Sequence, residues 1–354
     1  MSTYTIAIIR GDGIGPELVE AALDVLNPVA ARHEFALEYV EVDAGADTYR
    51  RTGANIEPAG LDVIRRCDAA FKGPVGLPDV RLPDGTEAGL LGGVLRVGLD
   101  LFANVRPIHL YQGAPARLKV DAGGLDYVVI RENTEGMYLA RGKGVGNREA
   151  MTDTLVVTRV GCERISRFAF EQARSRSGAV ADGTSRVTLV DKANVLRSMY
   201  FFREIFLAVA AEYPDIEHEC VHVDAAAQAL VLTPEHFDVI LTENLFGDIL
   251  SDLGGGTVGG VAMCPSGNIG HDNAYFEPIH GSAPSIAGQR LANPIGQILS
   301  AAMMLDYLGQ PAAADEIRDA VTTGLAGGAI TLTAAGGAAG GPQAVVDAVL
   351  AELP

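Results

Sequence analysis

Residues 4–26 read YTIAIIRGDGIGPELVEAALDVL and contain one complete strand, turn and helix pattern. Ile6–Ile9 is a short apolar run that favours a β-strand. Gly11–Pro16 then turns the chain. A proline followed by Glu17 suits the first turn of a helix, where an N–H is not needed and a carboxylate meets the positive helix end. Apolar residues recur at helical spacing up to Leu26, so the segment predicts a strand that leads through a tight turn into a helix.

The same alternation continues along the chain. Further strands are predicted at Leu37–Val42, Ala69–Lys72, Tyr127–Ile130, Val187–Val190, Cys220–Val223 and Val239–Thr242. Further helices are predicted near Ile165–Ala173, Arg197–Ala211, Pro294–Tyr307 and Gln343–Leu353. Residues 174–182 and 336–342 are expected to be loops, and Gly254–Gly256 is a candidate hinge. This pattern is typical of an α/β protein with mostly parallel strands and helices on both faces of the sheet.

The composition restricts the classes of function. The chain has 354 residues, which corresponds to about two domains. Its 27 Lys and Arg against 45 Asp and Glu give a formal net charge of −18. Such a surface repels nucleic acid and anionic membranes, so neither is an expected partner. Apolar residues make up 48% of the chain, enough for a large core.

The cysteines and the first residues indicate the compartment. Four cysteines lie far apart without a CxxC pair, which argues against a disulfide scaffold or a structural zinc site. The first residues lack the pattern of a cleaved leader, and the chain has no apolar run of 18 residues. We therefore expect a cytoplasmic protein.

The glycine turn Gly11-x-Gly13-x-Gly15 does not have the GxGxxG spacing of a dinucleotide-binding loop. We interpret it as a tight strand-to-helix turn.

Two aspartates four residues apart follow a predicted buried strand. Asp248 and Asp252 would share one face of a helix, where like charges repel. A divalent cation would remove this cost, and ligands that are all oxygen favour Mg²⁺ or Mn²⁺ over zinc. The alternative is a solvated helix face, although the neighbouring apolar residues argue against full exposure. The spacing alone leaves both interpretations open.

Other ionisable residues complete a possible site. Arg106 and Arg131 end apolar, strand-like runs and Arg96 precedes them, and arginine binds carboxylates bidentately. Beside paired acids, they suggest a polycarboxylate substrate next to a metal. Lys192 follows an apolar strand, and nearby positive charge would lower its pKa and let it act as a base. Tyr138 is a candidate proton donor. Taken singly, this lysine is better explained as a solvated strand end and this tyrosine as a core ring.

Taken together, the segments resemble the β-decarboxylating dehydrogenases, which are the isocitrate, homoisocitrate and 3-isopropylmalate dehydrogenases with their tartrate and D-malate relatives. The resemblance runs from Ile6 to about Leu350. It rests on eight segments in order: GDGIGPE (11–17), FKGP (71–74), LDLFANVRP (99–107), RENTEGMY (131–138), DKANV (191–195), VDAAAQ (223–228), NLFGDILSD (244–252) and EPIHGSAPSIAGQRLANP (277–294).

The resemblance implies a two-domain α/β fold that is not a Rossmann fold. Residues 1–101 and 257–354 would form a first, discontinuous domain on the cofactor side. Residues 102–256 would form an inserted domain that carries the dimer contacts and the metal and catalytic residues. The family is dimeric, so Lys192 and Asp224 would reach the site of the neighbouring chain, and the expected partner is a second copy with shared active sites.

The resemblance also implies a reaction. A 3-substituted malate would be oxidised at C2 and decarboxylated at C3, which gives a 2-oxo acid and CO₂. In that reaction Lys192 takes the hydroxyl proton and Tyr138 protonates the enolate. The other implied roles are substrate binding by Arg96, Arg106 and Arg131, Mg²⁺ or Mn²⁺ binding by Asp224, Asp248 and Asp252, and cofactor binding by His280, Gly281, Ser282, Ala283, Ser285, Ile286 and Asn293.

Two departures from the family pattern concern specificity. Members that use NAD carry Asp at the position of Ser285, and members that use NADP carry Lys followed by Tyr. Ser285 with Ile286 matches neither, so we favour NAD and keep NADP as an alternative, with Arg290 as a candidate phosphate contact.

The segment before Arg96 is also unusual. The isopropylmalate pattern Glu-x-Gly-Leu-Leu appears at 87–91, two residues further from Arg96 than in the family, which would rotate a helix by about 200°. The isocitrate and homoisocitrate signatures are absent. Gly92 and Gly93 leave room for a bulky C3 substituent, and Arg81 or Lys72 is a candidate to bind an acidic one.

Two alternatives stay open. One is a tartrate- or D-malate-type dehydrogenase, which on tartrate-like substrates would oxidise without decarboxylation. The other is a non-catalytic regulatory subunit of a heteromeric isocitrate dehydrogenase, although the chain lacks none of the metal or proton-transfer residues.

Overall fold

The computed structural model describes residues 2–121 and 123–354. Its strands are β1 (Ser2–Ile9), β2 (Phe35–Glu41), β3 (Ala69–Lys72), β4 (Ala103–His109), β5 (Asp126–Glu132), β6 (Val145–Gly146), β7 (Met151–Thr152), β8 (Arg186–Asp191), β9 (Glu217–His222), β10 (Val239–Thr242), β11 (Pro265–Ile269) and β12 (Ala274–Pro278). Its α-helices are α1 (Gly15–Arg32), α2 (Ala46–Thr52), α3 (Gly60–Arg66), α4 (Arg159–Ser175), α5 (Arg197–Ala210), α6 (Val223–Leu232), α7 (Asn244–Thr257), α8 (Ile295–Tyr307), α9 (Pro311–Ala326) and α10 (Pro342–Glu352).

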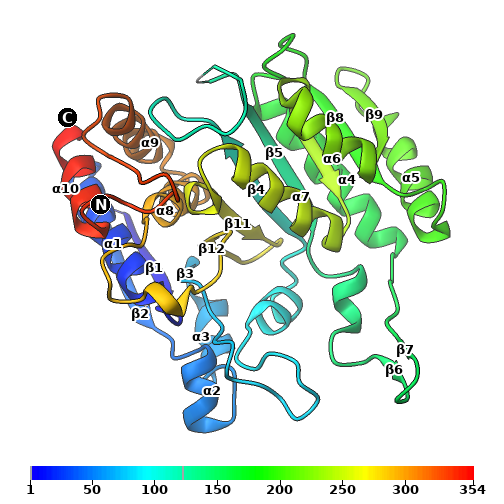
Figure 1. The fold of residues 1–354 in the computed structure, drawn as a ribbon, viewed down its shortest axis with the longest axis horizontal. Coiled ribbons are helices and arrows are strands. Elements are labelled where there is room, and N and C mark those ends of the chain that lie inside the picture. The colour runs from blue at the N-terminus through cyan, green and yellow to red at the C-terminus, as the bar shows by residue number, and fades with distance from the viewer. Residues whose placement is uncertain (1, 122) are drawn as a thin grey trace.

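One large sheet runs through the molecule in the order β2-β1-β3-β12-β11-β4-β5-β10-β8-β9, while β6 and β7 form a separate hairpin (Figure 1). Neighbouring strands of the large sheet are parallel except at β12–β11, β11–β4 and β4–β5. The predicted α/β class with a mostly parallel sheet is confirmed.

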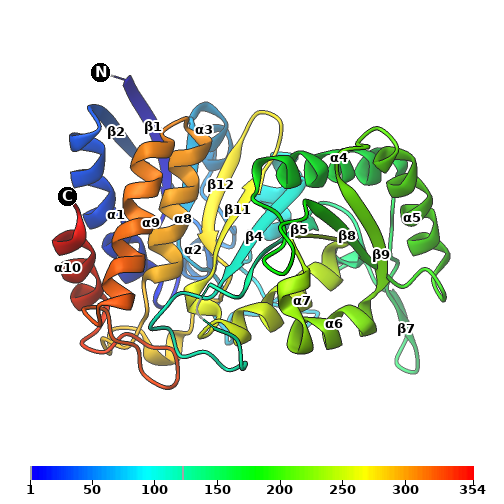
Figure 2. The same ribbon diagram turned by 90° about the horizontal axis from the view of Figure 1, so that it is seen from above.

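The two ends of the chain build one half of this sheet, and the middle segment builds the other. β1, β2, β3, β11 and β12 form the first half, which α1, α8, α9 and α10 cover near both termini (Figure 1). In the second half α4 lies on one face and α6 and α7 lie on the other (Figure 2). The division into domains 1–101 with 257–354 and 102–256 follows the same boundary and stays a prediction, because the sheet continues across it without a break.

The opening strand, turn and helix form as expected. β1 leads into a turn in which Gly11 and Gly13 have φ values of +77° and +58°, a region that glycine adopts without strain. α1 begins directly after this turn, with its proline in the first helical turn. The strand Ala69–Lys72 and the strand Val239–Thr242 also have the predicted bounds.

One prediction about flexible segments was wrong, and another began two residues too early. Gly254–Gly256 is not a hinge, because it lies inside α7. A Cβ on Gly254 would lie 2.5 Å from the hydroxyl oxygen of Tyr127 on β5, so the small residue lets the helix pack closely on the sheet. The loop expected at 174–182 begins only after Ser175, where α4 ends.

The central strands β11 and β12 and the helices α2, α3, α6 and α9 had no prediction. β11 reads PSGNI and has little β propensity of its own, but the residues of β11 and β12 are buried or half-buried. None of the helices in the described residues is long and apolar enough to cross a membrane.

Candidate active site

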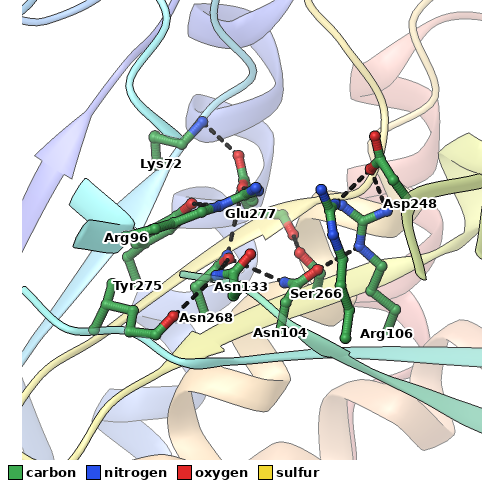
Figure 3. A network of polar contacts seen from close by, with 12 residues as sticks. Lys72, Arg96, Asn104, Arg106, Asn133, Asp248, Ser266, Asn268, Tyr275 and Glu277 are labelled. Atoms are coloured by element: carbon green, nitrogen blue, oxygen red, sulfur yellow. Dashed lines mark hydrogen bonds and ion pairs between the residues drawn. The ribbon is translucent and has the colours of Figure 1, made fainter. Parts of the chain in front are cut away.

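A buried group of charges lies where β4, β5 and α7 meet (Figure 3). Asn104 on β4 pairs with Arg131 on β5, and Arg106 lies two residues beyond Asn104. Residues two apart on a strand point to the same face, so both guanidinium groups point toward α7. Arg106 thus lies in the middle of β4 and not at its end, which corrects the sequence-based expectation.

Asp248 is the common partner of this group. Its Oδ1 lies 2.5 Å from Nη1 of Arg131 and 3.2 Å from Nη1 of Arg106. Its Oδ2 accepts a 2.7 Å hydrogen bond from the hydroxyl of Tyr138. Asp252, one turn further along α7, lies 3.9 Å from Nη1 of Arg106. The two aspartates therefore share one helix face, as their spacing predicts.

The two arginines are fixed by further side chains. Arg131 donates from Nε and Nη2 to Oδ1 of Asn244, at 3.0 and 2.7 Å. Arg106 donates to Oδ1 of Asn104 at 2.5 Å and to Oγ of Ser251 at 2.6 Å. Both side chains are almost completely buried. Rigid positions of this kind suit the recognition of carboxylates.

α7 approaches these strands because it has no side chain at Gly247. A Cβ there would lie 2.4 Å from Oγ1 of Thr242 and 2.7 Å from Cβ of Arg131. The helix begins with a cap in which Glu243 accepts from the N–H of Phe246 at 2.8 Å. The local sequence thus sets both the start of the helix and its distance from the sheet.

The pKa values show an excess of positive charge. Burial lowers the pKa of Arg131 to about 9, and the charges of Arg106 and Arg96 add to the effect. Burial would raise the pKa of Asp248, but Arg131 and Arg106 outweigh it and hold that pKa below its ordinary value. Arg131 and Arg106 contact Asp248 directly and the charge of Arg96 also acts on it, so the site favours further anions.

A second polar network, which the sequence analysis missed, lies beside the first (Figure 3). Nζ of Lys72 lies 2.5 Å from Oε2 of Glu277. Arg96 lies 3.6 Å from Oε1 of Glu277 and donates from Nε to the hydroxyl of Tyr275 at 3.1 Å. Burial would raise the pKa of Glu277, but Lys72 and Arg96 together lower it. Lys72 is therefore already neutralised, which argues against its proposed role as the partner of an acidic substituent.

Both networks face one cavity of about 220 Å³. Arg96, Arg106, Arg131, Tyr138 and Asp248 all line it, so the structure brings the three predicted substrate-binding arginines together with one predicted catalytic residue and one predicted metal ligand. Its other walls include Leu90, Leu91, Val75, Ile279 and Tyr275.

The segment that carries Arg96 differs from the expected helix. Gly93–Val97 is a π-helical turn, and Leu90 and Leu91 precede it. A rotation of about 200° calculated for an α-helix therefore does not apply, because a π-helix takes more residues per turn. Arg81 does not line the cavity, and its Nε donates to the carbonyl of Pro78 at 2.8 Å.

A separate cavity of about 520 Å³ lies on the side of the predicted cofactor residues. His280, Gly281, Ala283, Ile286 and Asn293 line it. His280 and Gly281 also line the arginine cavity, so they stand where the two cavities meet. Nε2 of His280 is buried without a hydrogen-bond partner in the described residues, and burial lowers the pKa of this histidine. Such an orphaned group fits a site that is completed by a ligand.

The other two predicted cofactor residues have different surroundings. Ser282 is buried: its hydroxyl donates to the carbonyl of Gly76, and its own carbonyl accepts from the N–H of Ile14 at 2.8 Å. Ser285 is exposed, and its carbonyl accepts from Gln289 at 2.7 Å. Neither lines the larger cavity.

The glycine turn has a role that the sequence analysis did not find. A Cβ on Gly13 would lie 2.1 Å from the carbonyl oxygen of Ser282. Asp12 accepts from the N–H groups of Ala46, Asp47 and Gly76 at 2.8, 3.0 and 2.8 Å. The turn therefore holds the loop that carries Ser282, one of the predicted cofactor residues, by close backbone contact.

The remaining two predicted residues lie apart from this group. Lys192 directly follows β8 and forms an ion pair with Asp224 at the start of α6. The side chain of Asp224 is 70% exposed. Across residues 2–121 and 123–354, no three His, Cys, Asp or Glu side chains gather closely enough to hold a metal ion. Within one chain, Asp224 therefore does not join Asp248 and Asp252.

Comparison with known proteins adds an independent finding. The family model for isocitrate/isopropylmalate dehydrogenase matches residues 5–349. The chain is 43% identical to a 3-isopropylmalate/3-methylmalate dehydrogenase of Methanocaldococcus jannaschii, over 93% of each chain. It is 41% identical to a 3-isopropylmalate dehydrogenase of Chlorobaculum tepidum, over 99% of each. The crystal structure of an isocitrate dehydrogenase from Methylococcus capsulatus superposes with a TM-score of 0.85 at 38% identity, covering 98% of this chain and 99% of that one.

Proposed function

Because the chain belongs to the isocitrate/isopropylmalate dehydrogenase family and is therefore an enzyme of the β-decarboxylating dehydrogenase class, we propose that it oxidises and decarboxylates a 3-substituted malate with NAD and a divalent cation. The observation that carries this proposal is the cavity in which three arginines, Tyr138 and Asp248 meet. Those side chains supply anion binding and a proton donor in one place. The products would be a 2-oxo acid and CO₂.

Substrate binding would fall to the arginines. Arg106 and Arg131 are held rigidly by Asn104, Ser251 and Asn244, so they lose little freedom when they bind carboxylates. Arg96 adds a third guanidinium on the opposite wall of the cavity. Together they would bind the two carboxylates of malate and fix C2 and C3 in the site.

Asp248 and Asp252 fit a divalent cation as two of its oxygen ligands. They share one face of α7. Burial raises the pKa of Asp252, and the like charge of Asp248 raises it further, while Arg106 lowers it. A cation relieves such a repulsion. Mg²⁺ or Mn²⁺ held by this pair and by Asp224 of the partner subunit would stabilise the negative charge that develops on the C2 oxygen.

Two side chains would move protons. Lys192, supplied by the second chain, would take the proton of the C2 hydroxyl as hydride leaves C2 for the nicotinamide. Tyr138 would then deliver its hydroxyl proton to C3 after CO₂ has left. Burial and the hydrogen bond to Asp248 raise the pKa of Tyr138, so the phenol is protonated and can act as a proton donor.

The cavity of about 520 Å³ would hold the nicotinamide nucleotide. Its wall is mostly apolar, with His280 and Asn293 as polar contacts, and it joins the arginine cavity at His280 and Gly281. This position would place the nicotinamide near C2 of the substrate. NAD is the favoured nucleotide because Ile286 replaces the tyrosine of NADP-using members, and NADP is the alternative that the assay below separates.

A homodimer is supported by apolar side chains at the surface. Val195, Leu196, Val231, Leu232 and Ile249 are all exposed, and they lie on or beside α5, α6 and α7. α6 and α7 are in contact, and exposed apolar residues on neighbouring helices favour a subunit interface there. Lys192 and Asp224 lie on the same part of the chain, so a second copy bound there would receive them.

The test is a substrate panel assayed with NAD and with NADP in the presence of Mn²⁺. We expect nucleotide reduction accompanied by CO₂ release with at least one of 3-isopropylmalate, isocitrate and homoisocitrate. EDTA should abolish turnover and added Mn²⁺ should restore it. Nucleotide reduction without CO₂ release on a tartrate-like substrate would assign a dehydrogenase that does not decarboxylate. Absence of turnover with every substrate would contradict the proposal.

A further inference from the structure

A second cavity, of about 320 Å³, lies next to Arg96. It is bounded by the π-helical turn on one side and by the chain that follows Tyr138 on the other. Gly92, Arg96, Tyr138 and Arg141 line both this cavity and the arginine cavity. A malate held by the three arginines can therefore extend a C3 substituent directly into it.

The charges of this second cavity are unusual for the molecule. Arg96, Arg141 and Lys143 line it, and no Asp or Glu does. The chain as a whole has a formal net charge of −18. No carboxylate of the described residues lies within 4.0 Å of the side-chain nitrogens of Arg141 or Lys143, whereas Arg96 faces Glu277 at 3.6 Å. Arg141 and Lys143 are exposed, and two such cations that line one cavity without a carboxylate favour an anionic ligand.

We infer that Arg141 and Lys143 form a subsite for a carboxylate at the end of the C3 substituent, so that the substrate is a tricarboxylic hydroxy acid. This inference rests on the proposed function and names its substrate class. Gly92, Gly93, Val97 and Leu139 supply uncharged parts of the wall of the same cavity. Such walls suit a short alkyl chain that carries the third carboxylate.

The two residues that were predicted as candidates to bind an acidic C3 substituent are not placed to bind it. Lys72 is buried against Glu277, and Arg81 lies outside both cavities. The apolar side chains of Leu90 and Val75 line the arginine cavity only. An alkyl substituent without charge would pack there instead and leave Arg141 and Lys143 unused. The two substrate classes therefore predict different roles for Arg141.

The first experiment compares kcat/KM for isocitrate, homoisocitrate and 3-isopropylmalate in the wild type, Arg141→Met and Lys143→Met. Arg66→Met is the matched control, because Arg66 is exposed on α3 and lines neither cavity. We expect the better tricarboxylate to exceed 3-isopropylmalate in the wild type. Loss of one charged hydrogen bond should lower its kcat/KM by about 10- to 100-fold in Arg141→Met, while the value for 3-isopropylmalate changes by less than about twofold.

The second experiment needs no turnover. Thermal unfolding is followed with tricarballylate, which carries three carboxylates and no hydroxyl, and with succinate, which carries two. Tricarballylate should raise the Tm of the wild type more than succinate does, and Arg141→Met should remove the difference. If tricarballylate binds in this way but no malate is oxidised, the proposed function fails and the subsite stands.

Two results would overturn the subsite. One is a wild type that prefers 3-isopropylmalate over every tricarboxylate. The other is an Arg141→Met variant that loses the same factor on all substrates, since that would indicate a general effect on the loop around Tyr138.

Discussion

The arginine–Asp248 group and the Lys192–Asp224 pair differ in how the chain holds them. Arg106 and Arg131 are buried in the sheet, and each has at least two side-chain partners from its own chain. Lys192 and Asp224 have 26% and 70% of their side-chain surface exposed and are joined to each other. One chain therefore fixes the geometry of the first group completely. The second pair is accessible from outside its own chain, so it could contribute to the site of a second chain.

This difference predicts which substitutions change both stability and activity and which change activity alone. A substitution in the buried group would remove proposed substrate contacts and also leaves partners unpaired in the core. A substitution in the exposed pair removes a functional group and disturbs little else, because exposed ion pairs contribute little to stability. The two kinds of substitution should therefore separate clearly when activity and unfolding are measured on the same variant.

The largest effect is expected for Arg131→Met. The substitution leaves Oδ1 of Asn244 without its donor and removes the 2.5 Å contact to Asp248. Breaking a buried ion pair in this way should lower the free energy of unfolding by about 3–5 kcal/mol. Urea unfolding measures it, with the exposed Arg66→Met as control, which should stay within about 0.5 kcal/mol of the wild type. A loss for Arg131→Met that is no larger than the control would contradict the account of the buried group.

Lys192→Met should separate activity from stability. A general base contributes at least about 100-fold, so kcat should fall by that factor or more. The free energy of unfolding should change by less than about 1 kcal/mol, because the ion pair to Asp224 is exposed. Turnover near the wild-type rate would remove Lys192 from the mechanism, and a large loss of stability would show that the pair is structural.

Gly13→Ala extends the comparison to the cofactor side. The added Cβ would lie 2.1 Å from the carbonyl oxygen of Ser282, and the φ of +58° disfavours any side chain. The strain should cost about 1–3 kcal/mol of stability. Because the loop from His280 to Ala283 must shift, the KM for NAD should rise while the KM for the hydroxy acid changes little. Gly53→Ala is the matched control, since that glycine also has a positive φ but nothing within 4 Å of the added Cβ.

The alternating strand and helix pattern was enough to predict the fold class, and spacing placed Asp248 and Asp252 on one helix face. The contacts that complete the site could not be predicted from a local sequence pattern. Lys72 and Glu277 are 205 positions apart and meet only because β3 and β12 are neighbours in the sheet. The π-helical turn at 93–97 depends on packing around Leu95, which is fully buried.

A mixing experiment tests directly whether the exposed pair serves a second chain. Lys192→Met and Asp252→Asn should each be inactive. Neither change should unfold the protein, because the Asp252 side chain is 59% exposed and Lys192 pairs with an exposed aspartate. When an equal mixture is refolded, half of the dimers are heterodimers. In each heterodimer, one of the two shared sites has both Lys192 and Asp252 intact, and the other site carries both substitutions. We therefore expect recovery of about a quarter of wild-type activity. If both residues served the site of their own chain, every site in the mixture would carry one defect and no activity would return.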